Sequence, residues 1–487
     1  MLVVRSIVAA RLLGPLPYGA WNAIQLIMDY GTTLPPIGTQ QGLDQSVPAR
    51  IVAGDTERLE RIERAGLFNI LVLTALFGAG FMLYALFTTN RFLGFWGAGW
   101  LLVAIAVIVM TNLSAYHMTL LRSHGNIGAV SGWFFLQGVV GTVLGVALIP
   151  AFGVRGLLGG WVAGTLVATI AVRLQGRRQV PIAPRLAPES LDLVRVGLPM
   201  FVFVASTQVM RSFDRLIILK FLGTLALGYY SVSVNALTFM LYLPDSIAYV
   251  LYPRLLREYG RHAGRPEAIR AGVERALGAL AVIVPALCGV AYLLAREAVA
   301  IVLPKFLPGV TPLRVLCFGA GGLALANLAS IVLMTLRLQN VLVASSVAMT
   351  LIGATLDYVA VRAGFGINGV ARMTLITYVV YGVTLLWLAL RGLGAGARDR
   401  VTVLVRALVP LLVSFVYAYA LDKLLPLSVN MSRPLLMVRL IAGVVAFGAL
   451  YSVSVIPFVR GLGLAQVLRE FNLPLPWAPR GTDAPPA

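Results

Sequence analysis

Long apolar runs alternate with short polar segments along the whole chain, and this pattern predicts its secondary structure. A helix that crosses a lipid bilayer needs about 20 mainly apolar residues. Thirteen runs reach that length, and each predicts a membrane-spanning helix. They lie at residues 19–38, 66–88, 93–115, 127–149, 155–174, 197–219, 227–250, 276–303, 309–335, 341–362, 366–390, 403–424 and 435–459. Residues 1–13 form another apolar run that is too short to cross, so we expect an all-α, polytopic membrane protein of about 14 spans, the first truncated.

The composition agrees with this pattern. Of the 487 residues, 59% are hydrophobic and only 12% are charged, and the mean hydropathy is +0.88. A soluble protein carries about 25% charged residues, so a soluble multidomain enzyme is excluded. A net charge of +20 can indicate nucleic-acid binding. Here the Arg residues stand between apolar runs, where they mark the cytoplasmic ends of membrane helices, and no nucleic-acid partner is expected.

The distribution of Lys and Arg predicts the orientation in the membrane. With the N-terminus in the cytoplasm, the segments on the inside hold more than twice as many Lys and Arg residues as those on the outside. We therefore expect both termini to be cytoplasmic. Two inside segments, 55–64 and 254–275, mix charges with apolar residues at helical spacing. They predict surface helices that anchor on anionic lipid headgroups.

Short motifs recur in the same order in the two halves of the chain. RLLGPLPYGAWNA at 11–23 matches KFLGTLALGYYSV at 220–232, and FGVRG at 152–156 resembles FGING at 365–369. The interval contains six predicted spans, an even number, so both copies have the same orientation. The pattern predicts two six-helix lobes related by a parallel repeat, plus two extra C-terminal helices.

The repeat divides the chain into predicted domains. The N-lobe covers residues 1–174 and the C-lobe residues 197–390, with a cytoplasmic linker at 175–196. The appended helices follow at 391–459, and residues 460–487 form a cytoplasmic tail.

The first apolar run is shorter than its counterpart in the repeat, which begins near Val196. Subtracting the 209-residue offset places the start of the first helix upstream of Met1. We therefore expect the chain to lack about ten to twenty N-terminal residues of a full first span. A genuinely short first helix is the alternative.

Polar residues inside the predicted spans are the strongest indication of function, because a charge or strong dipole in hydrocarbon costs several kcal/mol unless it faces water or a partner. Asn22, Gln25 and Asp29 share one helical face. In the run 197–219, the spacing is repeated by Gln208, Arg211 and Arg215, with Asp214 beside them.

This set of residues suits an anionic, sugar-bearing cargo. Arginine donates planar, permanently charged hydrogen bonds to pyrophosphate, and amides bond to sugar hydroxyls. The predicted substrate-binding residues are Arg5, Arg11, Asn22, Gln25, Gln208, Arg211 and Arg215. Asn22 and Gln25 could equally serve helix–helix packing.

Three carboxylates are candidates for binding a coupling ion, H⁺ or Na⁺. They are Asp29, Asp214 and Asp357. The structural alternative pairs Asp214 with Arg211 or Arg215, and Asp357 with Arg372.

Several kinds of chemistry have no matching motif. The sequence has no phosphate-binding Gly-rich loop ending in Lys-Ser/Thr, so we expect no direct use of ATP. Two cysteines and three scattered histidines provide neither a disulfide framework nor a metal site. We expect no cofactor, no metal and no catalytic residue, and the chain is not predicted to be an enzyme.

The repeated motifs resemble those of the polysaccharide-transport, Wzx-like flippases of the multidrug/oligosaccharidyl-lipid/polysaccharide exporter superfamily. The similar segments are ARLLGPLPYG, SFDRLIILKFLGTLALGYYSVS, LYPRLLREYG, and FGVRG with FGING. The resemblance implies a flippase in the cytoplasmic (inner) membrane, moving a polyprenyl-pyrophosphate-linked oligosaccharide to the outer leaflet by alternating access. Its expected partners are that cargo, membrane lipids, the coupling ion, and the polymerase and glycosyltransferases of cell-surface polysaccharide biosynthesis.

Other activities remain open at this point. A lipid II flippase or a drug/cation antiporter of the same superfamily is one alternative, although the basic face of residues 197–219 disfavours cationic drugs. A membrane-embedded glycan polymerase or ligase should carry carboxylates in a sizeable outer loop. The longest outer connection, 425–433, holds none.

Overall fold

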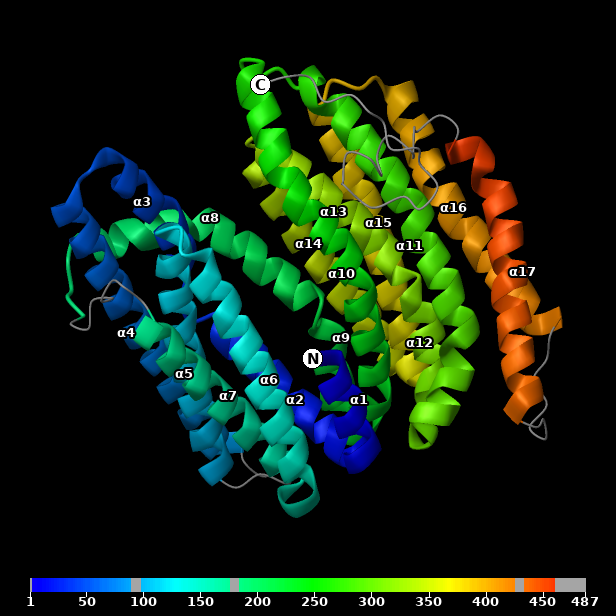
Figure 1. Cartoon of the computed structure of the whole chain (residues 1–487), viewed down its shortest axis with the longest axis horizontal. Coiled ribbons are helices and arrows are strands. Elements are labelled where there is room, and N and C mark those ends of the chain that lie inside the picture. The colour runs from blue at the N-terminus through cyan, green and yellow to red at the C-terminus, as the bar shows by residue number, and fades with distance from the viewer. Residues whose placement is uncertain (1, 89–97, 176–183, 425–432, 460–487) are drawn as a thin grey trace, which may run out of the picture. The chain divides into compact units, whose positions relative to one another are not determined.

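The computed structural model describes residues 2–88, 98–175, 184–424 and 433–459, and the elements among them are helices (Figure 1). The predicted tail, 460–487, lies outside the described residues. The helices are α1 Leu2–Leu13, α2 Pro15–Thr33, α3 Thr39–Ala53, α4 Thr56–Thr88, α5 Ala98–Ser123, α6 Ile127–Phe152, α7 Val154–Gln175, α8 Glu189–Met210, α9 Phe213–Phe221, α10 Gly223–Arg261, α11 Glu267–Val302, η1 Pro304–Gly309, α12 Val310–Cys317, α13 Gly319–Thr335, α14 Gln339–Arg362, α15 Gly366–Gly392, α16 Ala397–Leu424 and α17 Arg433–Val459.

Within the described ranges, 12 helical segments are long and apolar enough to cross a membrane. They coincide with twelve of the thirteen predicted full-length spans, which confirms a multi-pass, all-α membrane protein. The remaining predicted run, 19–38, is not helical to its end, and α2 covers it only as far as Thr33. α2 ends at Thr33, just before Pro35 and Pro36, and α3 starts at Thr39. Proline lacks a backbone donor and so ends a helix readily.

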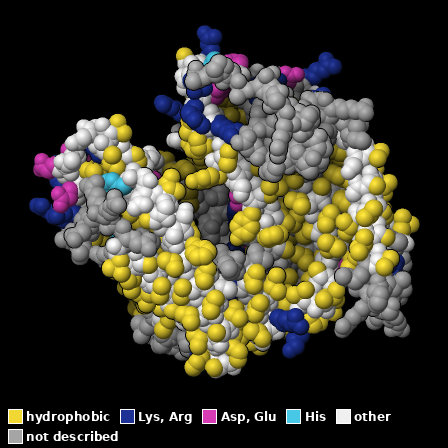
Figure 2. Space-filling view, in the orientation of Figure 1, with side chains coloured by type: hydrophobic (Ala, Val, Ile, Leu, Met, Phe, Trp, Pro, Cys, Tyr) yellow, Lys and Arg dark blue, Asp and Glu magenta, His cyan; other side chains and the backbone are white. Residues whose placement is uncertain are grey.

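The outer surface of the chain is apolar. Figure 2 shows hydrophobic side chains over much of the described part of the visible face, with most of the visible charged side chains at its margins. On α6, for example, Phe134 is 63% exposed and Phe135 is 68% exposed. Contiguous apolar surface of this extent is unfavourable in water and suits contact with lipid.

The chain packs into two compact units. Unit 1 comprises the described residues within Met1–Phe239, Ala295–Leu316 and Gln339–Thr377, and unit 2 those within Met240–Leu294, Cys317–Leu338 and Tyr378–Ala487. The long helices α10, α11 and α15 contribute to both units. The lobe boundaries expected from the sequence stay a prediction.

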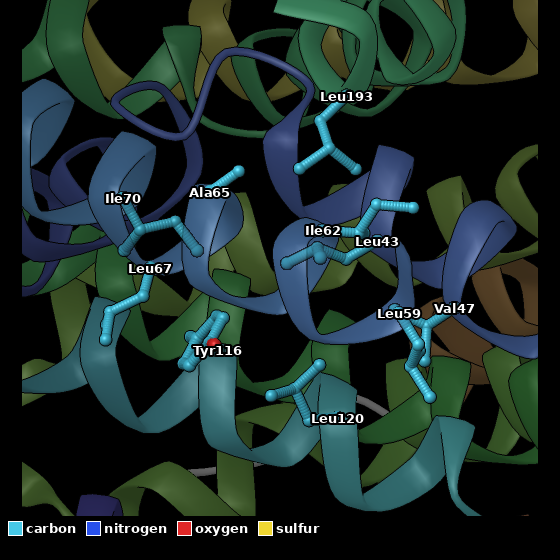
Figure 3. Close-up of a cluster of buried hydrophobic side chains, with 10 residues drawn as sticks. All are labelled: Leu43, Val47, Leu59, Ile62, Ala65, Leu67, Ile70, Tyr116, Leu120 and Leu193. Carbon is cyan, nitrogen blue, oxygen red and sulfur yellow. The ribbon is translucent and has the colours of Figure 1, made fainter. Parts of the chain in front are cut away.

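A tightly packed apolar cluster in unit 1 positions the start of α8. Its members come from α3, α4, α5 and α8 (Figure 3): Leu43, Val47, Leu59, Ile62, Ala65, Leu67, Ile70, Tyr116, Leu120 and Leu193. The backbones of α3 and α8 approach closely, because a Cβ on Gly42 would meet the Leu193 carbonyl and one on Gly197 the Gly38 carbonyl. The Asn69 side chain also donates to the Ser190 carbonyl, 2.8 Å away.

Unit 2 joins the appended helices to α11. Ser414 of α16 donates to the carbonyl of Pro285 at 2.6 Å, and Tyr451 of α17 donates to that of Val282 at 2.8 Å. A Cβ on Gly289 would meet the ring of Phe447. These contacts pack α16 and α17 directly against the middle of α11.

The parallel repeat is visible in the backbone of equivalent motifs. Gly14 and Gly223, both at the start of a long helix, have φ angles of 77° and 86°. Gly153 and Gly366 have φ angles of 57° and 58°. Only glycine adopts this left-handed region without strain, which explains why the motifs retain glycine at these positions.

The two charged segments that the sequence predicts to lie inside are extensions of membrane helices, which corrects the prediction of separate surface helices. α4 begins at Thr56 and runs without a break into its apolar part. In the second segment, α10 extends as far as Arg261 and α11 begins at Glu267. In α4 the charged turns carry pairs one turn apart, Arg61 with Glu57 at 2.5 Å and Arg64 with Glu60 at 2.6 Å. Such pairs favour helix continuation.

Candidate functional site

The predicted helix 197–219 is broken in its middle. α8 ends at Met210, and α9 begins at Phe213. The Ser212 hydroxyl donates to the carbonyl of Gln208 at 2.6 Å, a bond that competes with helical backbone bonding. The prediction of one continuous polar face is therefore wrong. Arg211 caps the end of α8, whereas Asp214 and Arg215 lie in the first turn of α9.

A hydroxyl pair connects this break to α2. The hydroxyls of Tyr30 and Ser212 lie 2.7 Å apart. Because Ser212 donates to Gln208, Tyr30 donates to Ser212. The break is thus held in register with the part of α2 that carries Asp29.

Asp214 is buried, with 2% of its surface exposed. Its carboxylate accepts a hydrogen bond from the Tyr230 hydroxyl at 2.6 Å and one from the backbone N–H of Arg215 at 2.7 Å. Among the described residues, no guanidinium lies within 4.0 Å of it. The expected ion pair with Arg211 or Arg215 is therefore absent, and a tyrosine takes its place.

Asp357 of α14 is also buried, at 4% exposure. It accepts a hydrogen bond from the Thr374 hydroxyl at 3.3 Å. The predicted pair with Arg372 is wrong: Arg372 is exposed, whereas Thr374, two residues later, is buried. Residues two apart point to nearly opposite sides of a helix, so α15 can turn only one of them towards Asp357.

Asp214 and Asp357 belong to one polar group. The charges of the two carboxylates act on each other, and both act on the Tyr230 hydroxyl. Thr374 also interacts with Tyr230. Tyr230 and Thr374 thus connect the two acids, and we call these four residues the carboxylate group.

Arg215 lies beside the carboxylate group without closing an ion pair. It is half-buried, and its Nε is buried with no hydrogen-bond partner among the described residues. Its charge acts on Asp214 from one side and on Asp29 of α2 from the other. No carboxylate of the described chain lies within 4.0 Å of this guanidinium.

The structure brings together only part of the residue set predicted from the sequence. The charge of Arg215 acts on both Asp29 and Asp214, and the Tyr30–Ser212 pair connects α2 to Gln208 at the break. Gln25, Asp29, Gln208, Arg211 and Arg215 are all half-buried. We call these five residues, which come from α2, the end of α8 and the start of α9, the α2–α9 polar set.

The other predicted residues lie around Tyr18 and at the end of α1. Arg5 is 4% exposed, with its guanidinium carbon 4.9 Å from the Trp161 ring centre and 5.9 Å from that of Trp21. The Asn22 amide donates to the Tyr18 carbonyl at 2.8 Å. Arg11 is exposed at the last turn of α1. No contact of these three with Arg215 is observed among the described residues.

Sequence reasoning missed the uncharged members of the site. Tyr30, Ser212, Tyr230 and Thr374 carry no charge, so a search for charged residues inside spans passes over them. Tyr230 had one available signal, since it lies within the repeated motif at 220–232. In the described ranges, no group of three His, Cys, Asp or Glu residues could hold a metal ion.

Comparison with known proteins identifies related families and folds. The family model described as "Polysaccharide biosynthesis protein" matches residues 8–306, more than half of the chain. A search of curated proteins found no match.

Three solved structures share the fold. A multidrug resistance transporter of the MATE family and MOP superfamily, in an inward-facing conformation, is 17% identical over 81% of this chain and 94% of its own, with a TM-score of 0.68. The lipid II flippase MurJ, in an inward closed conformation, is 12% identical over 94% and 96%, with a TM-score of 0.67. MATE in the bent conformation is 17% identical over 82% and 93%, with a TM-score of 0.57.

Proposed function

Because the chain belongs to the polysaccharide biosynthesis protein family, we propose that it is a flippase for a polyprenyl-pyrophosphate-linked oligosaccharide. It moves this cargo from the inner to the outer leaflet of the cytoplasmic (inner) membrane, with both termini in the cytoplasm. Transport proceeds by alternating access, coupled to H⁺ or Na⁺. The fold shared with MATE transporters and with MurJ supports a membrane transporter. The family supports a role in cell-surface polysaccharide biosynthesis.

The observation that carries the proposal is the environment of the Arg215 guanidinium. This guanidinium is half-buried, leaves its Nε without a hydrogen-bond partner among the described residues, and closes no ion pair there. A cation inside a membrane protein is costly unless a partner satisfies it. A pyrophosphate supplies several acceptor oxygens and matches the planar donors of arginine. Arg211, on the other side of the break, provides a second guanidinium.

The amides of the α2–α9 polar set suit the sugar. Gln25 and Gln208 are half-buried, and each amide offers both donors and acceptors. Arg11 and Asn22 remain predicted contacts, without support from proximity to Arg215, whereas the buried Arg5 lies against two tryptophan rings and is assigned mainly to stability.

The carboxylate group suits the coupling ion. Asp214 and Asp357 are both buried, and their charges act on each other. A proton or Na⁺ bound here reduces that repulsion. Because the charge of Asp214 also acts on Arg215, neutralising Asp214 leaves Arg215 more attractive to an anionic cargo. The ion and the cargo are then linked through Arg215, because binding of either one changes the affinity for the other.

The proposal is tested by expressing variants of this chain in a strain that lacks the flippase and measuring the amount of surface glycan. Arg215→Ala should abolish surface glycan at an unchanged level of protein in the membrane. Arg372→Ala is the matched control, because Arg372 is a membrane-segment arginine that is exposed and closes no ion pair among the described residues. Wild-type glycan levels with Arg215→Ala would remove Arg215 from the site.

A further inference from the structure

A compact group of aromatic and basic side chains lies where α9 and α14 end. Phe221 is the last residue of α9, and Tyr358 lies one turn before the end of α14. Their ring centres are 5.6 Å apart, with an interplanar angle of 63°. Phe221 is 40% exposed and Tyr358 is 39% exposed, so the pair is a partly open aromatic surface.

Two cations share this aromatic surface. The Lys220 Nζ lies 5.4 Å from the centre of the Phe221 ring, and the Arg362 guanidinium carbon lies 6.0 Å from the same centre. Arg362 is also 5.5 Å from the Tyr358 ring centre, and its Nε donates to the Tyr358 hydroxyl at 2.9 Å. This hydrogen bond fixes the guanidinium while its remaining N–H groups stay exposed.

No acidic residue balances the two charges. In the described part of the chain, neither Lys220 nor Arg362 has a carboxylate within 4.0 Å. Each cation is attracted to the rings, but the two repel each other. An anion between them would remove this repulsion. The arrangement therefore fits a ligand with a phosphate group.

The depth of the group indicates a lipid. Lys220 and Arg362 lie at the ends of helices, next to the turns at Gly223 and Gly364. Basic residues and tyrosines at the ends of spans lie among the lipid headgroups. A phosphate at that depth is carried by a lipid.

Comparison with the other half of the repeat argues against an ordinary membrane anchor. At the 209-residue offset, Lys220 and Phe221 correspond to Arg11 and Leu12. At the 213-residue offset of the FGVRG and FGING motifs, Tyr358 and Arg362 correspond to Gly145 and Ile149. Both rings and the second cation thus occur in one half only. A structural requirement of the fold would apply to both halves.

We propose that Lys220, Phe221, Tyr358 and Arg362 bind the pyrophosphate of the carrier lipid in the outer leaflet, after translocation. The assignment to the outer leaflet follows from the predicted orientation, which places these helix ends outside. There, Lys and Arg are less frequent than on the inside. The proposal rests on the proposed function for the identity of its occupant.

The site is tested by binding of polyprenyl pyrophosphate, without sugar, to the protein in zwitterionic nanodiscs. Arg215→Ala serves as the background, so that Arg215 does not contribute. In this background, Lys220→Gln with Arg362→Gln should weaken binding at least about tenfold, because two charge-assisted contacts are lost. Lys423→Gln is the matched control: Lys423 lies 5.8 Å from the Tyr419 ring centre at another helix end, as a single cation on a single ring. The Arg215→Ala protein that also carries Lys423→Gln should bind polyprenyl pyrophosphate with the same affinity as the Arg215→Ala protein alone.

Three results would overturn the proposal: unchanged affinity in the double variant, equal weakening in the Lys423 control, or equal binding of neutral polyprenol. Displacement by phosphatidylglycerol at equal concentration would identify the occupant as bulk anionic lipid and contradict the assigned ligand. Folding is checked by the elution volume and melting temperature of each variant. The proposed function fails separately, if the wild type binds this probe but transports no lipid-linked oligosaccharide.

Discussion

Gly19 and Gly228, which occupy equivalent positions in the two halves of the chain, lie against each other. A Cβ on Gly19 would meet the Thr224 carbonyl and, at 2.9 Å, the backbone nitrogen of Gly228. A Cβ on Gly228 would meet the Pro15 carbonyl and, at 3.3 Å, the nitrogen of Gly19. The contacts are reciprocal at one offset, 209 residues, as expected of a two-fold relationship between repeats.

This close approach makes Gly228 sensitive to one added methyl group. Gly228→Ala should destabilise the protein by at least about 2 kcal/mol, because the new atom meets backbone that cannot move aside easily. The measurement is the melting temperature of detergent-solubilised protein. Gly132→Ala is the control, since nothing lies within 4 Å of a Cβ there. Equal melting temperatures for the two variants would mean that the helices do not cross at Gly19 and Gly228.

Two residues of α15 are candidates for supporting Asp357 in ion coupling: Thr374, which contacts it, and Arg372, which the sequence suggested as its partner. Thr374→Val removes the hydroxyl that donates to Asp357 and should weaken the dependence of transport on the ion gradient about tenfold. Arg372→Ala should leave that dependence unchanged, because Arg372 is exposed. The rate of cargo transport as a function of the H⁺ or Na⁺ gradient distinguishes them. A loss of coupling with Arg372→Ala alone would restore the pair expected from the sequence.

Arg5 should contribute to stability more than to cargo binding. Its guanidinium lies buried by the rings of Trp161 and Trp21, and a cation–π contact that is shielded from water contributes about 1–2 kcal/mol. Arg5→Gln should therefore lower the melting temperature and leave the dissociation constant for the lipid-linked oligosaccharide unchanged. A variant with normal stability but weakened cargo binding would place Arg5 in the binding site, as the sequence suggested.

The fold could be predicted largely from the sequence because its determinants are periodic. Span length follows from the bilayer thickness, and the repeat is visible in motifs such as those at Gly14 and Gly223. The glycines identify positions where the backbone turns or helices approach closely, and both uses are observed. The end of α2 at Thr33, before the predicted run 19–38 is complete, also has a local cause, because Pro35 and Pro36 follow directly.

The candidate site could be predicted only in part, because its decisive contacts join residues that no periodicity relates. Asp214 and Tyr230 are 16 residues apart and on different helices, so charge alone suggested arginine partners. The break at Ser212 has no clear signal in the sequence, because Ser231 and Ser346 make the same hydrogen bond to the carbonyl four residues earlier within continuous helices. The sequence suggested Arg372 as the partner of Asp357 because it is charged. The residue that contacts Asp357 is Thr374, two positions later.

The proposed transport requires Arg215 to bind an anionic cargo. A transport assay with the reconstituted protein tests this requirement directly. Purified protein in proteoliposomes should carry a fluorescent polyprenyl-pyrophosphate-linked oligosaccharide between leaflets when an H⁺ or Na⁺ gradient is imposed. Arg215→Ala should reduce the initial rate at least about tenfold, equivalent to about 1.4 kcal/mol of lost stabilisation. A wild-type protein that moves no cargo under either gradient, or an Arg215→Ala variant that transports at the wild-type rate, would contradict the account.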